Sequence, residues 1–437
     1  MVKDVLKLLL YDWQNRDLPV VLPRELDIDK YIKMKLNKVI VLNGFRRVGK
    51  TYLLMHVAKE LLKTNSRRQV VYLNFEDERI PLKTEFLTEL IPTIEEMWGE
   101  APKYLLLDEV QLVPNWSKWV RRIYDQYNIR FFITGSNSKM TTVGIPTELR
   151  GRFIEKHIYP LNFREYLQFK KINIEVENIE YNQRVKSKLL KYVGDYLRIG
   201  GLPEIVLSQD EDFNELVQGY FRTVVSRDII ELHNIQNVNG LKALLKILLN
   251  SKEFTVNRIF NVLKSMNHEI GKTTLQNYIG YAHDAFFLNA VEAFSFKVVK
   301  AELHPRKVYF VDNAFIKFLS TKLSDDKARF FENSVAVLLQ SKTEELNYFK
   351  TLNNQYEVDF VIRDHDKIKQ LIQVCSDISN SKTMEREIRA FAQAQGELKC
   401  KNHLLINADT DKTEKVNWFG KKIEVRMIPL YRWLLEY

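Results

Sequence analysis

The chain has little of several features that mark secreted or membrane proteins. Among 437 residues there are two cysteines, Cys375 and Cys400, which by themselves cannot build a disulfide framework or a metal site. No apolar run approaches the length of a membrane span, and the N-terminus lacks a signal-peptide pattern. Internal repeats and low-complexity segments are also missing. These absences predict a globular, cytoplasmic protein in a reducing compartment.

The composition is that of an ordinary folded protein, with 45% hydrophobic and 28% charged residues. The length allows two or three domains, each with its own core. The net charge of +10 favours contact with polyanions. Lysine-rich surfaces are common in some organisms, however, so the charge alone leaves nucleic-acid binding open.

The segment GFRRVGKTYLL, residues 44–54, joins an apolar, β-branched run to a stretch with helical periodicity. A strand, a flexible loop and a helix start are the context that the phosphate-loop motif G-x-x-x-x-G-K-[ST] requires. We expect Gly44 and Gly49 to let the backbone wrap the phosphates of ATP or ADP. Lys50 should reach the β- and γ-phosphates, and Thr51 should bind Mg²⁺. The residues predicted to contact nucleotide here are Gly44, Phe45, Arg46, Arg47, Val48, Gly49, Lys50, Thr51 and Tyr52.

Two further apolar runs end in polar residues that complete a catalytic set. KYLLLDEVQLVPNW predicts a strand that ends at Asp108, which should hold the water shell of the metal, and Glu109, which should orient or deprotonate water. An acidic pair at a strand end can also be merely solvated. FFITGSNSKM predicts another strand, and Ser136 after it can sense the γ-phosphate.

The order of GFRRVGKT, LLLDEVQLVPNWSKWV, FFITGSNSKM, ELRGRF and YPLNFREYL resembles a prokaryotic AAA+ ATPase family, typical of archaea and bacteria. The C-terminal part of that family is a domain of unknown function with a nuclease-like core. The resemblance covers most of the chain and implies hydrolysis of ATP to ADP and phosphate. It also implies that Arg150 or Arg152 neutralises charge near the γ-phosphate, although two arginines beside a glycine can equally form a surface loop.

We therefore expect an α/β protein with a P-loop, RecA/AAA+-like parallel sheet covered on both faces. The expected parts are an N-terminal arm (1–29), the nucleotide-binding domain (30–165), a helical lid (166–210), a winged helix-turn-helix domain (211–320) and a restriction-endonuclease-like α/β domain (325–437). In the lid, YLRIGGLPEIV is broken by Gly200, Gly201 and Pro203. This stretch is either a plain turn or, as in similar signalling ATPases, a segment whose Pro203 packs over the adenine.

The winged helix is predicted from a helix, a turn, a second helix and a β-ribbon within residues 254–310. Lys272, Thr273 and Thr274 begin the helix in the recognition position. The residues of the ribbon that are available for DNA phosphates are Lys297, Lys300, Arg306 and Lys307. Winged helices also mediate protein contacts, so duplex DNA contact and a purely structural role both stay open.

The last domain departs from the nuclease pattern at two positions. Glu332 on a helix and Asp359 on a strand fit that pattern, but Gln373 and Cys375 stand where glutamate and lysine are required. An amide is a poor ligand for a hard cation, and a thiol is not a cationic donor. We expect a nuclease-like fold without nuclease activity.

Two hypotheses for the function follow. In the first, the protein is an ATP-hydrolysing switch whose basic domains bind duplex DNA. In the second, it is a regulatory protein that holds nucleotide and recruits a protein partner, with little turnover.

Overall fold

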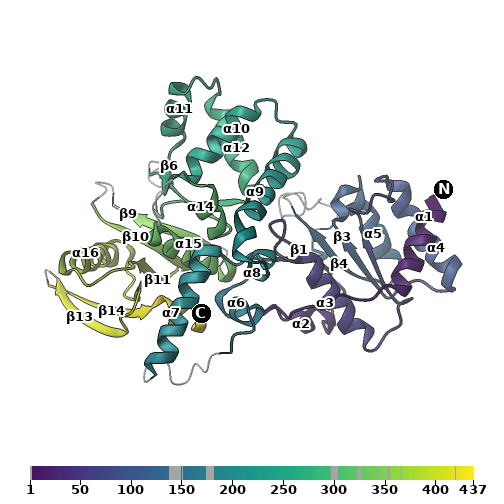
Figure 1. The fold of residues 1–437 in the computed structure, drawn as a ribbon, viewed down its shortest axis with the longest axis horizontal. Helices are drawn as coiled ribbons and strands as arrows, with labels where there is room; N and C mark the ends of the chain where they lie inside the picture. The colour runs from purple at the N-terminus through teal and green to yellow at the C-terminus, as the bar shows by residue number, and fades with distance from the viewer. Residues whose placement is uncertain are drawn as a thin grey trace. The chain divides into compact units, whose positions relative to one another are not determined.

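The computed structural model describes residues 2–136, 149, 151–173, 182–296, 304–321, 326–343, 345–351, 355–365, 367–418 and 420–437. The chain divides into two compact units (Figure 1). The first comprises Met1–Ile158 and Asp284–Phe286, and the second comprises Tyr159–His283 and Phe287–Tyr437. Across the described ranges, no helix combines the length and apolarity that crossing a lipid bilayer requires.

The first unit is built on a five-stranded sheet in which all paired strands are parallel, in the order β2-β3-β4-β1-β5. Strands β1 to β4 are mostly apolar and buried, as parallel sheets require, whereas the edge strand β5 has the sequence FIEKH and is only half-buried. The predicted parallel α/β sheet is confirmed. The elements are α1 (Val2–Asn15), α2 (Ile28–Ile32), β1 (Val39–Asn43), α3 (Lys50–Leu62), β2 (Val70–Asn74), α4 (Thr84–Trp98), β3 (Tyr104–Asp108), a 3₁₀ helix (Val110–Leu112), α5 (Trp116–Gln126), β4 (Arg130–Gly135) and β5 (Phe153–His157).

The N-terminal residues form helix α1, which is part of the core of this unit. Leu6 and Leu10 are fully buried in the cluster that also contains residues of α4, α5 and the sheet. Trp13 is buried as well. The prediction of a polar arm over residues 1–29 is therefore wrong for α1. Apolar residues at positions 6, 10 and 13 follow helical spacing, whereas the prediction of an arm rested on the polar, proline-containing residues 11–29.

The described residues of the second unit form two sheets. A three-stranded antiparallel sheet has the order β6-β8-β7, and a six-stranded mixed sheet has the order β13-β14-β12-β11-β10-β9. The elements up to the first sheet are α6 (Phe163–Phe169), α7 (Gln183–Ile199), α8 (Pro203–Leu207), a 3₁₀ helix (Asp210–Asp212), α9 (Phe213–Thr223), a π-helix (Val224–Glu231), α10 (Val238–Leu249), β6 (Glu253–Phe254), α11 (Val256–Ser265), α12 (Lys272–Asp284), β7 (Leu288–Val291) and β8 (Arg306–Phe310).

The six-stranded sheet packs against α16 (Ser381–Leu398) around Leu371, Phe391 and Leu405. In it, β12 pairs in parallel with β11 and β14, whereas β10 is antiparallel to β9 and β11. The remaining elements are α14 (Asn313–Leu319), α15 (Lys327–Lys342), β9 (Leu346–Lys350), β10 (Glu357–Asp364), β11 (Lys367–Val374), α16 (Ser381–Leu398), β12 (His403–Asn407), β13 (Lys412–Trp418), β14 (Lys421–Pro429) and α17 (Leu430–Glu436).

Candidate functional site

The loop between β1 and α3 has a backbone that depends on glycine. Gly44 has φ 147° and Gly49 has φ 96°, both positive values that glycine adopts without strain. A Cβ on Gly44 would lie 2.3 Å from the Ile158 carbonyl oxygen, so a larger residue would displace the loop. Helix α3 begins at Lys50, directly after this turn. The amides of its first turn therefore face the loop and can bind an anion.

Lys50 points back into the loop rather than out to solvent. Its Nζ donates to the carbonyl oxygens of Gly44 at 2.9 Å and Phe45 at 3.0 Å. The same Nζ lies 3.9 Å from Oε1 of Glu109, and the lysine is only 5% exposed. The ammonium is thus held next to the predicted water-priming acid.

Asp108 lies at the end of β3, between β2 and β4, and is 1% exposed. The Tyr72 hydroxyl donates to its Oδ2 at 3.0 Å, and the Thr134 hydroxyl donates to its Oδ1. Burial raises the pKa of Asp108 above its usual value, while hydrogen bonds from the Thr134, Thr51 and Tyr72 side chains oppose that rise. Burial and the nearby Asp108 carboxylate also raise the pKa of Tyr72, so this hydroxyl stays a donor.

The side chains of Thr51 and Asp108 fit a magnesium ion. The Thr51 side chain acts on the Asp108 carboxylate and opposes the rise of its pKa, so a hydroxyl and a carboxylate, both hard oxygen donors, lie close together. Within the described residues, no group of three or more His, Cys, Asp or Glu side chains is arranged to hold a metal. A magnesium ion here would accordingly take its other ligands from water and phosphate, which is its usual preference.

Glu109 follows Asp108 with a positive φ of 56°, an uncommon conformation for a residue that is not glycine. Its Oε2 accepts hydrogen bonds from the Ser136 hydroxyl at 2.9 Å and from the Gln111 amide. Its backbone N–H donates to the Thr134 hydroxyl at 3.1 Å. Ser136 therefore lies at the predicted site and contacts the predicted acid directly. Gln111 was missed, because nothing in its sequence context separates it from an ordinary polar residue.

Other residues of the loop hold it to its surroundings. Phe45 and Val48 are fully buried, and the Arg46 guanidinium pairs with the Glu76 carboxylate at 2.8 Å. The Arg24 guanidinium, from the segment before β1, donates to the Val48 carbonyl at 3.0 Å. Tyr52 is 56% exposed. The nucleotide contacts expected of these residues stay predictions.

Arg152 lies at the end of the sheet opposite the phosphate loop. Its carbonyl accepts from the Val39 N–H at the start of β1, whereas the phosphate loop follows the end of β1. Its guanidinium pairs with Asp125 of α5 at 3.3 Å. The prediction that Arg152 neutralises a γ-phosphate bound by the same chain is therefore wrong. Arg150 lies outside the described residues.

The glycines of the predicted lid are fixed by an aspartate from a distant part of the second unit. Asp312 accepts from the Gly201 N–H at 2.7 Å and from the Ala314 N–H at 2.8 Å. A Cβ on Gly200 would lie 1.6 Å from Asp312 Oδ1. Burial raises the pKa of Asp312 to about 7, although the backbone amides it accepts from oppose the rise. Pro203 is the first residue of α8. These contacts favour the plain-turn interpretation, and the adenine contact of Pro203 stays a prediction.

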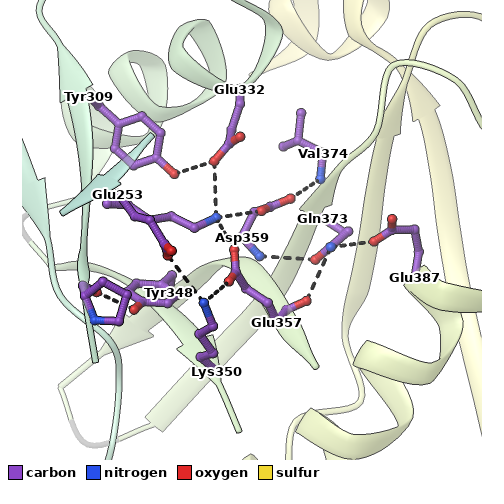
Figure 2. A network of polar contacts seen from close by, with 12 residues as sticks. Glu253, Tyr309, Glu332, Tyr348, Lys350, Glu357, Asp359, Gln373, Val374 and Glu387 are labelled. Atoms are coloured by element: carbon purple, nitrogen blue, oxygen red, sulfur yellow. Dashed lines mark hydrogen bonds and ion pairs between the residues drawn. The ribbon is translucent and has the colours of Figure 1, made fainter. Parts of the chain in front are cut away.

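Lys307 is not available for DNA, so this part of the wing prediction is wrong. It is 6% exposed, and its Nζ lies 2.7 Å from Asp359 Oδ1, 2.8 Å from Glu357 Oε1 and 3.2 Å from Glu332 Oε1. Figure 2 shows these carboxylates converging on one ammonium. Arg306 pairs with Glu292 at 2.9 Å, while Lys297 and Lys300 lie outside the described residues. The contacts of Lys307 are long-range in sequence, so the local pattern could not reveal them.

The same cluster corrects the reasoning about the C-terminal region. Cys375 does not leave Asp359 without a cation, because Lys307 from β8 supplies one. The other oxygen of Asp359 accepts from the Val374 N–H at 2.9 Å. Gln373 is buried among protein partners, where its Oε1 accepts from the Asp359 N–H and its Nε2 donates to Glu387 (Figure 2).

Residues 36–167 match the AAA domain family, which agrees with a parallel sheet that carries a phosphate-loop sequence. Residues 190–327 match a domain of unknown function (DUF8612). The chain is 36% identical over 421 residues to the uncharacterized protein MJ1544 of Methanocaldococcus jannaschii, covering 94% of this chain and 91% of that protein. It belongs to the same family as MJ1544.

A more distant relative is an uncharacterized protein of Haemophilus influenzae, 28% identical over 356 residues, covering 80% of this chain and 85% of that protein. Among solved structures, the Walker-type ATPase PABY2304 of Pyrococcus abyssi aligns with a TM-score of 0.45 and 14% identity. That alignment covers 68% of this chain and 96% of the other.

Proposed function

We propose that the first unit binds ATP with magnesium and hydrolyses it to ADP and phosphate, as a nucleotide-dependent switch. The observation that carries this proposal is the meeting of Lys50, Asp108 and Glu109 at one edge of the sheet. Lys50 Nζ lies 3.9 Å from the Glu109 carboxylate, and the Thr51 side chain is close enough to Asp108 to oppose the rise of its pKa. These are the residue types that phosphoryl transfer from a nucleotide needs.

Each residue has a distinct role in this scheme. Lys50 would leave its carbonyl partners in the loop and bind the β- and γ-phosphates, while the α3 amides hold the phosphate chain. Glu109 would orient the attacking water and accept its proton. Ser136 would position Glu109 through the hydrogen bond that already joins them. Bound magnesium would supply charge neutralisation at the phosphates.

Replacement of Lys50 tests the binding step. We expect Lys50→Ala to weaken ATP binding roughly tenfold to hundredfold, because a charge-assisted hydrogen bond contributes about 1.5–3 kcal/mol. Isothermal titration calorimetry with a slowly hydrolysed ATP analogue measures the dissociation constant. Lys63→Ala is the control, since Lys63 caps the far end of α3 and forms an ion pair with the nearby Glu60. Equal affinities of the Lys50→Ala and parent proteins would reject the assignment of the phosphate site.

For the second unit, we propose that ATP state is coupled to duplex DNA binding through α12. Its side chains divide into two faces: Leu275 and Tyr278 are buried, whereas Lys272, Gln276 and Asn277 are exposed. The order α11, α12, β7, β8 is the one a winged helix has, which supports placing α12 in a DNA groove. Among the predicted wing residues, Lys307 no longer contributes.

A variant of α12 tests DNA contact. We expect Lys272→Ala with Gln276→Ala and Asn277→Ala to weaken duplex binding roughly tenfold or more. The slope of log affinity against log salt concentration should become shallower by about one, the value for one lost phosphate contact. Fluorescence anisotropy at several salt concentrations measures both. Lys382→Ala, at the exposed start of α16, removes the same charge elsewhere and should change little. Parent-like affinity and salt slope in the triple variant would contradict a DNA role for α12.

The alternative function, a nucleotide-holding protein that recruits a protein partner, is favoured by the contacts of Glu109. Ser136 and Gln111 bond its carboxylate, and Lys50 is nearby, so the acid must be released before it can serve water. ADP retained through purification, with no DNA binding, would support this alternative. DNA-stimulated hydrolysis would support the first proposal.

We propose that the C-terminal region keeps a nuclease-like fold without nuclease activity. Asp359 is bonded at both oxygens by protein groups, and Lys307, the nearby cation, is enclosed by three carboxylates. In this arrangement the ammonium and the carboxylates are paired with one another and are not free to bind a metal or a substrate.

A further inference from the structure

Tyr72 is a residue at the nucleotide site that the scheme above leaves without a role. It lies in β2, next to β3, and its hydroxyl donates to Asp108 Oδ2. Thr134, in β4 on the other side of β3, donates to Asp108 Oδ1. The carboxylate at the end of β3 is therefore held from both neighbouring strands, with one hydroxyl on each oxygen.

The sheet register explains why a tyrosine is needed for this contact. Tyr72 is aligned with Leu106 in β3, and Asp108 lies two residues after Leu106. Because alternate residues of a strand share a face, the side chains of Tyr72 and Asp108 lie on the same face of the sheet. A short side chain at position 72 would not reach the strand end. The last torsion of an aspartate is broad, so the hydrogen bonds decide which way the Asp108 carboxylate faces.

Tyr72 is in turn held by helix α1. The Trp13 ring packs on the Tyr72 ring with centroids 5.5 Å apart, and the indole N–H donates to the Val70 carbonyl at 2.7 Å. The Arg67 guanidinium covers the indole at 4.7 Å and donates to the Trp13 carbonyl. Since Leu10 anchors α1 in the core, Trp13 has a fixed position from which to support Tyr72.

We propose that Tyr72 is a positioning residue for the metal-binding carboxylate of Asp108, and that α1 keeps Tyr72 in place through Trp13. This inference rests on the proposed nucleotide function. A carboxylate with a fixed plane presents its oxygens to the metal without reorganising first. Loss of the Tyr72 hydroxyl should therefore weaken divalent-cation binding, whereas metal-free nucleotide binding depends on Lys50 and the loop amides.

The test measures metal affinity without requiring turnover. Mn²⁺ is titrated into the full chain with saturating ADP, and free Mn²⁺ is followed by electron paramagnetic resonance. We expect Tyr72→Phe to weaken Mn²⁺ binding about threefold to tenfold, the range for one lost hydrogen bond, with unchanged ADP affinity in chelator. Tyr104→Phe, at the opposite end of β3, is the matched control and should behave as the parent.

The contribution of α1 is tested by a double-mutant cycle. We expect Trp13→Leu to weaken Mn²⁺ binding as well, and Trp13→Leu with Tyr72→Phe to be no weaker than Tyr72→Phe alone, because both act through one hydroxyl. Trp13→Phe, which keeps a ring against Tyr72, should have an intermediate effect. It also serves if Trp13→Leu fails to fold.

The possible outcomes separate this inference from the proposed ATPase activity. Unchanged Mn²⁺ affinity in Tyr72→Phe overturns the positioning role, as does an equal loss of metal-free ADP binding. Additive effects in the cycle overturn the role of α1. A parent chain that binds Mn²⁺ and ADP but hydrolyses no ATP would refute the ATPase activity and leave the inference standing, whereas a parent chain that binds neither refutes both.

Discussion

Glu109→Gln is expected to lower ATP turnover by on the order of a hundredfold or more while leaving ATP binding nearly unchanged. The amide keeps the shape of the carboxylate and can still accept from Ser136, but it cannot take a proton from water. Lys50 would remain at the phosphates, so affinity should hold. Phosphate release gives the rate, and calorimetry gives the dissociation constant.

The control for this variant is Glu85→Gln, which changes an exposed glutamate in the first turn of α4. It should hydrolyse ATP at the parent rate. Parent-like turnover in Glu109→Gln would show that another group primes the water. A matching loss of binding would show that the glutamine disturbs the loop rather than the chemistry.

Lys307→Met should destabilise the second unit by about 3–5 kcal/mol, the cost of leaving buried carboxylates without their partner. Lys307 lies within 3.2 Å of Glu332 and closer still to Glu357 and Asp359. Urea denaturation, with hydrogen exchange of β10 amides as the probe, measures the free energy of unfolding. Lys369→Met breaks an exposed pair with Asp364 and should cost at most about 1 kcal/mol.

The loss of stability caused by Lys307→Met should grow as the pH rises. Burial raises the folded-state pKa of Asp359 to about 7, although the Lys307 ammonium opposes the rise. The ordinary value is about 3.9. The folded state therefore binds the Asp359 proton more tightly than the unfolded state, and stability falls as pH rises between these two values.

Without Lys307 the pKa of Asp359 rises further. The variant should consequently lose more stability relative to the parent at about pH 8 than at about pH 5. Asp359→Asn in the same background should recover part of the loss, and no recovery would contradict the charge explanation.

Local patterns in the sequence led to residues that the structure brings together at one edge of the sheet, and their roles in nucleotide binding stay predictions. Each of these residues lies at or just after the carboxyl end of a predicted strand: the phosphate loop after β1, Asp108 and Glu109 at the end of β3, and Ser136 after β4. Parallel strands have their carboxyl ends at the same edge of a sheet, so these residues meet there. The part that the sequence could not show is the support around these residues. Tyr72 lies inside an apolar run, and its contact with Asp108 depends on the register between two strands.

Long-range contacts explain the errors in the second unit and at the sheet edge. Lys307 looked like a wing lysine because its neighbours in sequence are basic, but its partners come from α15 and β10. Arg152 belongs to the motif ELRGRF, which the resemblance associates with phosphate. It directly precedes β5, and because β5 runs parallel to β1, Arg152 lies at the end of the sheet opposite the phosphate loop. In both cases the sequence identified a basic residue, but its position in space depends on contacts with elements far away in the chain.

The most direct test of the central claim is phosphate release from ATP, measured side by side for the parent chain, Lys50→Ala and Glu109→Gln. The account predicts release by the parent that requires magnesium and stops in chelator, with ADP formed in equal amount. Lys50→Ala should be slow because it binds ATP weakly, and Glu109→Gln should be slow although it binds ATP well. Release at the parent rate by either variant, or no release by a parent chain saturated with magnesium and ATP, would contradict the claim that this edge of the sheet hydrolyses ATP.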